Sequence, residues 1–226
     1  MGKRGPKPKG NVKIEWSPNF AYAIGLLVSD GSLSKNGRHI VFTSKDIEQL
    51  ENFMRALGIQ GIFVGYTKST DKYGSRMIAR VQFGDVLFYQ FLLKIGLMPN
   101  KSKIIGEVKV PHKYFFDFLR GVFDGDGCTH SYFDPRWKSS FMFYTIFTSS
   151  SLAHILWLQD NIQARLQIKG HITGNGIKSA YQLKYAKADS LKLLPKMYSG
   201  EDLLYLGRKR LKIEQMLRTI GRSLND

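Results

Sequence analysis

The chain has 226 residues, 43% of them apolar, which is enough to build a core without disulfide or metal cross-links. Its 34 lysines and arginines outnumber 18 acidic residues, which gives a formal net charge of +16 and an isoelectric point near 9.9. This surplus favours nucleic acid as the partner over an anionic membrane surface. The sequence has no run of about eighteen apolar residues, so it lacks the signature of a membrane-spanning helix.

Cysteine and histidine usage argues against disulfides and zinc. Cys128 is the only cysteine, and the histidines at 39, 112, 130, 154 and 171 lack metal-ligand spacing. The N-terminus resembles neither a signal peptide nor a myristoylation site, because Pro6 stands where Ser or Thr would be needed. We therefore expect an unsecreted protein in a reducing compartment, either the prokaryotic cytoplasm, associated with the nucleoid, or an organelle matrix.

The first elements are a basic arm and a helix. Residues 1–12 begin with a stretch rich in Gly, Pro, Lys and Arg that cannot bury a core, and we expect a flexible arm. Whether this arm contacts a polyanion or is only solvated is left open. The apolar pattern from Ser17 to Leu27 then predicts a helix, capped by Ser17 with Pro18 in its first turn.

An internal repeat divides the chain into two related halves. The segment at 42–59 reads FTSKDIEQLENFMRALGI, and its partner at 147–166 reads FTSSSLAHILWLQDNIQARL. Both predict amphipathic helices, with Ser44 and either Ser149 or Ser150 as caps and Gly58 as the end of the first helix. The expected core-facing residues are Ile47, Leu50, Phe53, Met54 and Leu57, matched by Leu152, Ile155, Leu158 and Ile162.

Alternating patterns predict three strands in each half. They cover 38–43, 63–68 and 76–83 in the first half, and 141–147, 171–173 and 181–187 in the second. Each sheet would have an apolar face and a wet, basic face that could lie in a DNA groove or simply face solvent. A break with Pro111 at 108–113 separates the halves, so we expect repeats at 13–108 and 114–226 joined by a linker at 109–113.

Two short segments have the composition of a catalytic site. AIGLLVSDG at 23–31 and LRGVFDGDG at 119–127 each predict a helix ending at an Asp-Gly pair. Gly25 and Gly121 lie within these helices, where glycine disfavours helix and calls for close helix packing. Packing the helices side by side would bring Asp30 and Asp126 together at two negative helix ends. A divalent cation such as Mg²⁺ would relieve that repulsion and suits oxygen ligands.

These segments resemble the two copies of the nine-residue motif that names the LAGLIDADG homing endonuclease family. The resemblance implies an α+β fold with two pseudo-twofold αββαββα halves forming a saddle with antiparallel DNA-binding sheets. It implies two or three Mg²⁺ ions bound by Asp30 and Asp126, with help from the carbonyls of Ser29 and Gly125. The sixth motif position is Asp124 in the second copy but Val28 in the first.

The resemblance also indicates basic catalytic residues. Lys45 follows the first hairpin, and its repeat equivalent is Ser150. The segments NKSK at 100–103 and GRKRLK at 207–212 supply Lys101 and Lys209. Close competitors for these two roles are Lys103, Arg208 and Arg210.

The wet sheet faces supply candidate DNA contacts, with Arg and Gln suited to base edges and Lys to phosphates. The candidates are Lys35, Arg38, Lys68, Arg76, Arg80, Gln82, Arg136, Lys138, Gln182, Lys184 and Lys187. The second half carries an insertion around 132–140 that we expect to form a loop along the DNA. Two unequal halves in one chain predict a monomer and a non-palindromic target.

The leading hypothesis is therefore an intron-encoded endonuclease that cuts both strands of a long DNA site with a divalent metal. An RNA-binding maturase that assists an intron is the alternative on the same scaffold. A DNA-binding regulator is a third interpretation. The two intact carboxylates, Asp30 and Asp126, favour cleavage over both.

Overall fold

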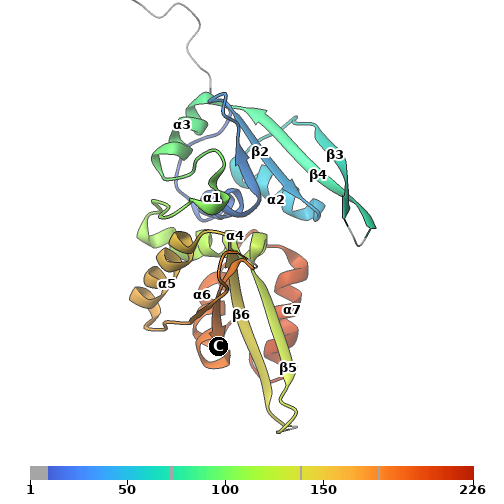
Figure 1. The fold of residues 1–226 in the computed structure, drawn as a ribbon, viewed down its shortest axis with the longest axis vertical. Helices are drawn as coiled ribbons and strands as arrows, with labels where there is room; N and C mark the ends of the chain where they lie inside the picture. The colour runs from blue at the N-terminus through green and yellow to red at the C-terminus, as the bar shows by residue number, and fades with distance from the viewer. Residues whose placement is uncertain (1–9, 72–73, 138, 178) are drawn as a thin grey trace, which may run out of the picture.

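The computed structural model describes residues 10–71, 74–137, 139–177 and 179–226, and places two similar halves on either side of a central helix pair (Figure 1). The first half contains α1 (Pro18–Asp30), β1 (Gly31–Leu33), β2 (His39–Ser44), α2 (Ile47–Leu57), β3 (Val64–Asp71), β4 (Gly74–Gly84) and α3 (Val86–Lys94). The second contains α4 (Phe115–Asp126), β5 (Cys128–Phe133), β6 (Phe141–Ser149), α5 (Leu152–Leu166), β7 (His171–Thr173), β8 (Tyr181–Ala186) and α6 (Lys187–Tyr198).

Each half contains a four-stranded antiparallel sheet, with the orders β1-β2-β4-β3 and β5-β6-β8-β7. The 3-10 helix η1 (Lys101–Lys103) follows α3, and α7 (Gly207–Arg218) follows α6 at the equivalent place. A second 3-10 helix, η2 (His112–Tyr114), leads into α4. The predicted α+β fold of two αββαββα halves is confirmed.

The predicted ends of the first helix are confirmed, whereas the predicted caps of the repeat helices are not. Ser17 caps α1, which continues past the apolar pattern and ends at Asp30, as the Asp-Gly pair predicted. Ser44 and Ser149 are not helix caps, because β2 and β6 run through them and the N-caps are Asp46 and Ser151. Gly58 ends α2 in the left-handed conformation, as predicted.

The predicted core stripes are correct except at their first residue. Leu50, Phe53, Leu57, Ile155, Leu158 and Ile162 are buried and Met54 is half-buried, but Ile47 and Leu152 are 42% and 41% exposed. Each is the first residue of its helix.

The N-terminal segment docks on α3 before α1 begins. The backbone N–H groups of Asn11 and Val12 donate to the carboxylate of Asp85, at 2.6 and 2.9 Å, and Val12 is buried. The same carboxylate accepts the N–H of Phe88 and so caps α3. Of the predicted arm, residues 1–9 lie outside the described part of the chain.

The two halves meet where α1 packs directly on α4 (Figure 1). A Cβ added to Gly25 would lie 2.2 Å from the carbonyl oxygen of Phe118, and one added to Gly121 would lie 2.1 Å from that of Tyr22. Neither position tolerates a side chain, because the obstacle is backbone. The sequence-based reason for these glycines, close helix approach, is confirmed.

Replacing Gly121 by alanine should destabilise the protein. The added methyl group forces the backbones apart, an overpacking cost that exceeds the gain in helix propensity, and we expect a net loss of about 2 kcal/mol. Urea unfolding measures the change. Gly106→Ala is the control, because its Cβ would meet only the Ala153 methyl group, at 3.8 Å. Equal stability of the two variants would contradict the packing argument.

A buried carboxyl group joins the halves beside this contact. Asp124, on α4, accepts hydrogen bonds from the hydroxyls of Tyr22 and Tyr198, at 2.9 and 2.6 Å, and from the backbone N–H of Leu206, at 2.7 Å. The carboxyl group therefore connects α1, α4, α6 and the segment that leads into α7. Val28, at the equivalent position of α1, is apolar and makes no such network.

Removing one of these donors should cost stability in proportion to the burial of its acceptor. We expect Tyr198→Phe to lower the free energy of unfolding by about 2 kcal/mol, because the Asp124 carboxyl loses a partner and is buried away from solvent. Tyr185→Phe is the matched control, since no described residue bonds the buried hydroxyl of Tyr185. Thermal unfolding of both variants measures the difference, and similar losses would refute the assignment.

Candidate active site

Two aspartates end the paired helices. Asp30 is the last residue of α1 and Asp126 the last of α4, and each is followed by a glycine whose N–H bonds back into the helix. A Cβ on Gly125 would lie 2.3 Å from Cβ of Ser29 and 3.1 Å from a carboxylate oxygen of Asp30. The glycine at 125 therefore lets the two helix ends, and with them the two acids, come together.

The environment makes both carboxyl groups harder to ionise. Burial, followed by the charge of Asp126, raises the pKa of Asp30 from 3.8 to about 6. Partial burial likewise raises the pKa of Asp126, although its side chain remains more exposed. The charges of Lys101 and Lys209 act in the opposite sense on both acids. Two acids with raised pKa values beside two lysines form a cluster typical of a functional site.

The two lysines approach the carbonyl groups that the resemblance assigns to metal. The Nζ of Lys209 donates to the carbonyls of Phe123, Gly125 and Gly127, at 2.7, 2.9 and 2.7 Å. The Nζ of Lys101 donates to the carbonyl of Ser29, at 3.4 Å. Each lysine therefore lies at the negative end of a motif helix, where a cation is stabilised by the helix dipole.

Burial lowers the pKa of Lys101 and of Lys209 from 10.5 to about 8, with desolvation as the largest cause in each case. Both ammonium groups remain mostly charged at neutral pH. They can balance the carboxylates and bind a phosphate, or give up a proton more readily than an ordinary lysine.

Lys45 lies near this cluster but in a different setting. It is exposed and lines a shallow hollow together with Asp30, Asp46, Gly125 and Arg208. Its repeat equivalent, Ser150, lines another hollow with Lys103 and residues of the β7–β8 connection. The hollow that contains Asp30 is therefore lined by a lysine at the repeat position where the second half has a serine.

The donor set fits a hard divalent cation. Two carboxylates and the carbonyls of Ser29 and Gly125 offer only oxygen, which Mg²⁺ and Ca²⁺ prefer. Within the described ranges, no group of three or more His, Cys, Asp or Glu side chains is placed to hold a metal. An ion at Asp30 and Asp126 would thus take its remaining ligands from water and from a phosphate substrate.

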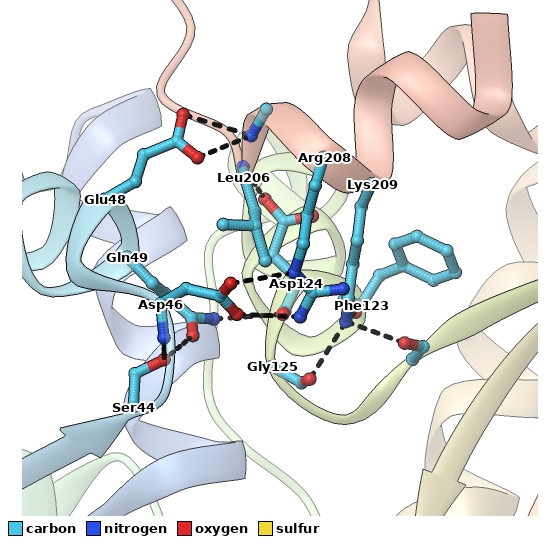
Figure 2. A network of polar contacts seen from close by, with 12 residues as sticks. Ser44, Asp46, Glu48, Gln49, Phe123, Asp124, Gly125, Leu206, Arg208 and Lys209 are labelled. Carbon is cyan, nitrogen blue, oxygen red and sulfur yellow. Dashed lines mark hydrogen bonds and ion pairs between the residues drawn. The ribbon is translucent and has the colours of Figure 1, made fainter. Parts of the chain in front are cut away.

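Polar side chains that sequence reasoning missed surround the start of α7 (Figure 2). Four residues of the first half contact the second: Asp46 and Glu48 contact the start of α7, Gln49 contacts α4, and Asn52 contacts the segment before α7. Ser44 supports them by donating to the side chain of Gln49. Gln49 donates to the carbonyl of Asp124, at 2.9 Å. The available signal was the polarity of these α2 positions, several of which are apolar or neutral in the second copy.

The outer faces of the two sheets hold some of the predicted DNA contacts. Strand pairing sets Arg80 opposite Thr43, and Gln82 opposite Val41, on the exposed face of the first sheet. In the second sheet, Lys184 pairs with Ile146 and Gln182 with Thr148. Lys35 and Arg38 are exposed in the β1–β2 turn.

The remaining candidates do not lie on these faces or are not described. Lys68 pairs with Met77 and so lies on the opposite face from Arg80. Lys187 belongs to α6, where its Nζ donates to the carbonyl of Phe141, at 3.1 Å. Arg136 is exposed but pairs with Asp134. Lys138 and the side chain of Arg76 fall outside the described residues.

The hairpins of the two halves differ in length: the second hairpin is the longer one in the first half, and the first hairpin is the longer one in the second half (Figure 1). In the first half β3 and β4 pair over eight positions, whereas β7 and β8 pair over three. In the second half β5 and β6 pair over six positions, against three for β1 and β2. The insertion predicted as a loop at 132–140 is partly strand, because β5 continues to Phe133 before the connection to β6.

No helix in the described part of the chain has the length and apolar character to cross a bilayer.

Comparison with known proteins shows which family model and which solved structures the chain is similar to. A family model described as the LAGLIDADG-like domain matches residues 17–96. None of the curated proteins matches the chain at a significant level. The chain is also similar to solved structures, all with low sequence identity, so that the likeness concerns the fold.

Full-length DUF199/WhiA from Thermatoga maritima has a TM-score of 0.55 and 14% identity, covering 92% of this chain and 62% of that one. The chain thus spans less than two thirds of the length of this relative. The homing endonuclease I-WcaI, bound to its DNA recognition sequence, has a TM-score of 0.63 and 14% identity, covering 87% and 86%. I-SmaMI, bound to an uncleaved DNA target in the presence of calcium ions, has a TM-score of 0.57 and 11% identity, covering 91% of both chains.

Residues 17–96 therefore match the LAGLIDADG-like domain, and the chain as a whole shares its fold with LAGLIDADG homing endonucleases.

Proposed function

We propose that the chain is a site-specific endonuclease that makes a metal-dependent double-strand break in a long, non-palindromic DNA target. The observation that carries the proposal is the pair of acids, Asp30 and Asp126, held together at two helix ends with Lys101 and Lys209 beside them. Homing endonucleases and WhiA both have this fold, so the fold alone does not identify a nuclease and the proposal depends on the residues of the site.

The acids and lysines supply complementary parts of phosphodiester hydrolysis. A divalent ion held by Asp30 and Asp126 would activate water and stabilise charge on the phosphate. Lys101 and Lys209, each within the same cluster, would bind the phosphate oxygens and balance the acids. Two acids serve two strands, which fits a double-strand cut by one chain.

The basic surface and the unequal hairpins support a long and asymmetric target. The net charge of +16 supplies phosphate affinity. Arg80, Gln82, Gln182 and Lys184 lie on outer sheet faces, where two-stranded ribbons can enter a major groove. Because the longer hairpin is β3–β4 in one half and β5–β6 in the other, the two half-sites would be contacted differently.

Cleavage of a randomised duplex library tests the proposal. With Mg²⁺, the native chain should cut one long site, and chelator should abolish cutting. Asp30→Asn and Asp126→Asn should each slow double-strand cleavage by about 100-fold or more, because each removes charge from the metal site. Both should still bind duplex DNA, since the basic surface is unchanged.

Asp160→Asn is the matched control, because Asp160 lies exposed on α5 and its loss changes the net charge equally. It should leave cutting intact. Specific duplex binding without cutting by the native chain would instead support a DNA-binding protein that does not cleave. Tight binding of structured intron RNA, with no duplex cut from a deep library, would support the maturase alternative.

A further inference from the structure

The polar face of α2 holds the start of α7, which belongs to the other half of the chain (Figure 2). Asn52 donates to the carbonyl of Tyr205, at 2.8 Å. Both carboxylate oxygens of Glu48 accept the backbone N–H of Gly207, at 3.1 and 3.0 Å. These contacts join residues far apart in the sequence: 153 positions separate Asn52 from Tyr205, and 159 separate Glu48 from Gly207.

The contact with Glu48 suits a helix N-terminus. The first N–H groups of a helix have no partner within it, and the N-terminus carries partial positive charge, so a carboxylate is stabilised there. A Cβ on Gly207 would lie 2.9 Å from one oxygen of Glu48 and 3.3 Å from the other. Glycine at 207 therefore allows the carboxylate to approach the backbone.

Arg208 adds a second, bidentate contact. Its Nε and Nη2 donate to the two carboxylate oxygens of Asp46, at 2.9 and 2.7 Å. This geometry fixes direction as well as distance, unlike a single exposed ion pair. Asp46 is also the residue that precedes α2, so the pair ties the start of one helix to the start of another.

Lys209 follows these held residues directly. Its Nζ bonds three carbonyls at the end of α4, whereas the Nζ of Lys101 bonds one at the end of α1. The long lysine side chain reaches those carbonyls only if the start of α7 stays in place. Asp46 and Glu48 thereby connect to Lys209 through Arg208 and Gly207, which lie one and two residues before it.

The equivalent contact between the start of α5 and the segment after Lys101 involves no charged side chains. In the repeat register, Ser151 and His154 of α5 replace Asp46 and Gln49 of α2. Ser151 donates to the carbonyl of Ile105, and the Nδ1 of His154 bonds that of Gly106, at 2.8 Å. Burial lowers the pKa of His154 from 6.5 to about 4, so this ring is neutral at physiological pH. These residues hold the segment after Lys101 without ionic contacts.

We propose that Asp46 and Glu48 are positioning residues for Lys209, so that the first half of the chain holds a lysine of the second half in the active site through ionic contacts. The lysine of the first half, Lys101, is held without them. The effect of Asp46 and Glu48 on DNA cutting rests on the proposed nuclease function, whereas their effect on the placement of Lys209 does not.

Amine labelling tests the placement directly. The full chain is treated with limiting acetic anhydride, and modification of Lys209 and Lys101 is followed by mass spectrometry. In Asp46→Asn/Glu48→Gln, we expect Lys209 to react several-fold faster while Lys101 is unchanged. Asp46→Glu, which keeps a carboxylate for Arg208, should remain close to the native rate.

Gly207→Ala separates positioning from folding. Its methyl group displaces only the end of the Glu48 side chain, and alanine favours helix, so the protein should stay folded while Lys209 labelling rises. Glu214→Gln is the matched control, because it removes an ion pair with Arg210 on α7 itself and leaves the start of the helix alone. Glu214→Gln should change the labelling rate of neither Lys209 nor Lys101.

Strand-resolved cleavage then measures the consequence. Asp46→Asn/Glu48→Gln should slow one strand more than the other, so that nicked DNA accumulates, whereas Glu214→Gln should cut both strands as the native chain does. Unchanged Lys209 labelling, or an equal rise at Lys101, would overturn the positioning role. If labelling responds as expected but the native chain cuts no DNA, the positioning role stands and the nuclease proposal fails.

Discussion

The rest of the structure depends on the backbone contact between α1 and α4 at Gly25 and Gly121. Their missing side chains let each helix lie against a carbonyl of the other, and Gly125 extends the approach to the helix ends. Because Asp30 and Asp126 are the last residues of these helices, the contact determines that the two acids meet. The same contact orients the halves, since each sheet begins immediately after its motif helix.

This approach creates an electrostatic problem that the chain answers with lysine. Two helix C-termini and two carboxylates in one place repel each other. Lys101 and Lys209 supply positive charge to the carbonyls at these ends, and both are buried enough for desolvation to lower their pKa values to about 8. A cluster that is balanced by lysine in this way is also suited to exchange those contacts for a divalent ion and a phosphate group.

The sequence predicted features that repeat locally, and failed where distant segments meet. Internal repeats, helical glycines and Asp-Gly endings indicated two halves with paired acids, because each copy of these patterns is a short continuous segment. The partnership of Asp46 with Arg208 spans 162 residues and leaves no periodic trace. Lys68 was assigned to the same face as Arg80, but the strand register, which depends on hairpin pairing, places it on the other.

The two halves share a backbone plan while their polar contacts have diverged. Asp124 gathers three donors on α4, where α1 has Val28, and α2 holds α7 with carboxylates, where α5 uses Ser151 and His154. A homodimer could not maintain such differences, because every contact would occur twice. In one chain, each half can be adjusted separately. The apolar helix pair therefore preserves the symmetry of the scaffold, and the polar residues around it make the surroundings of the two acids unequal.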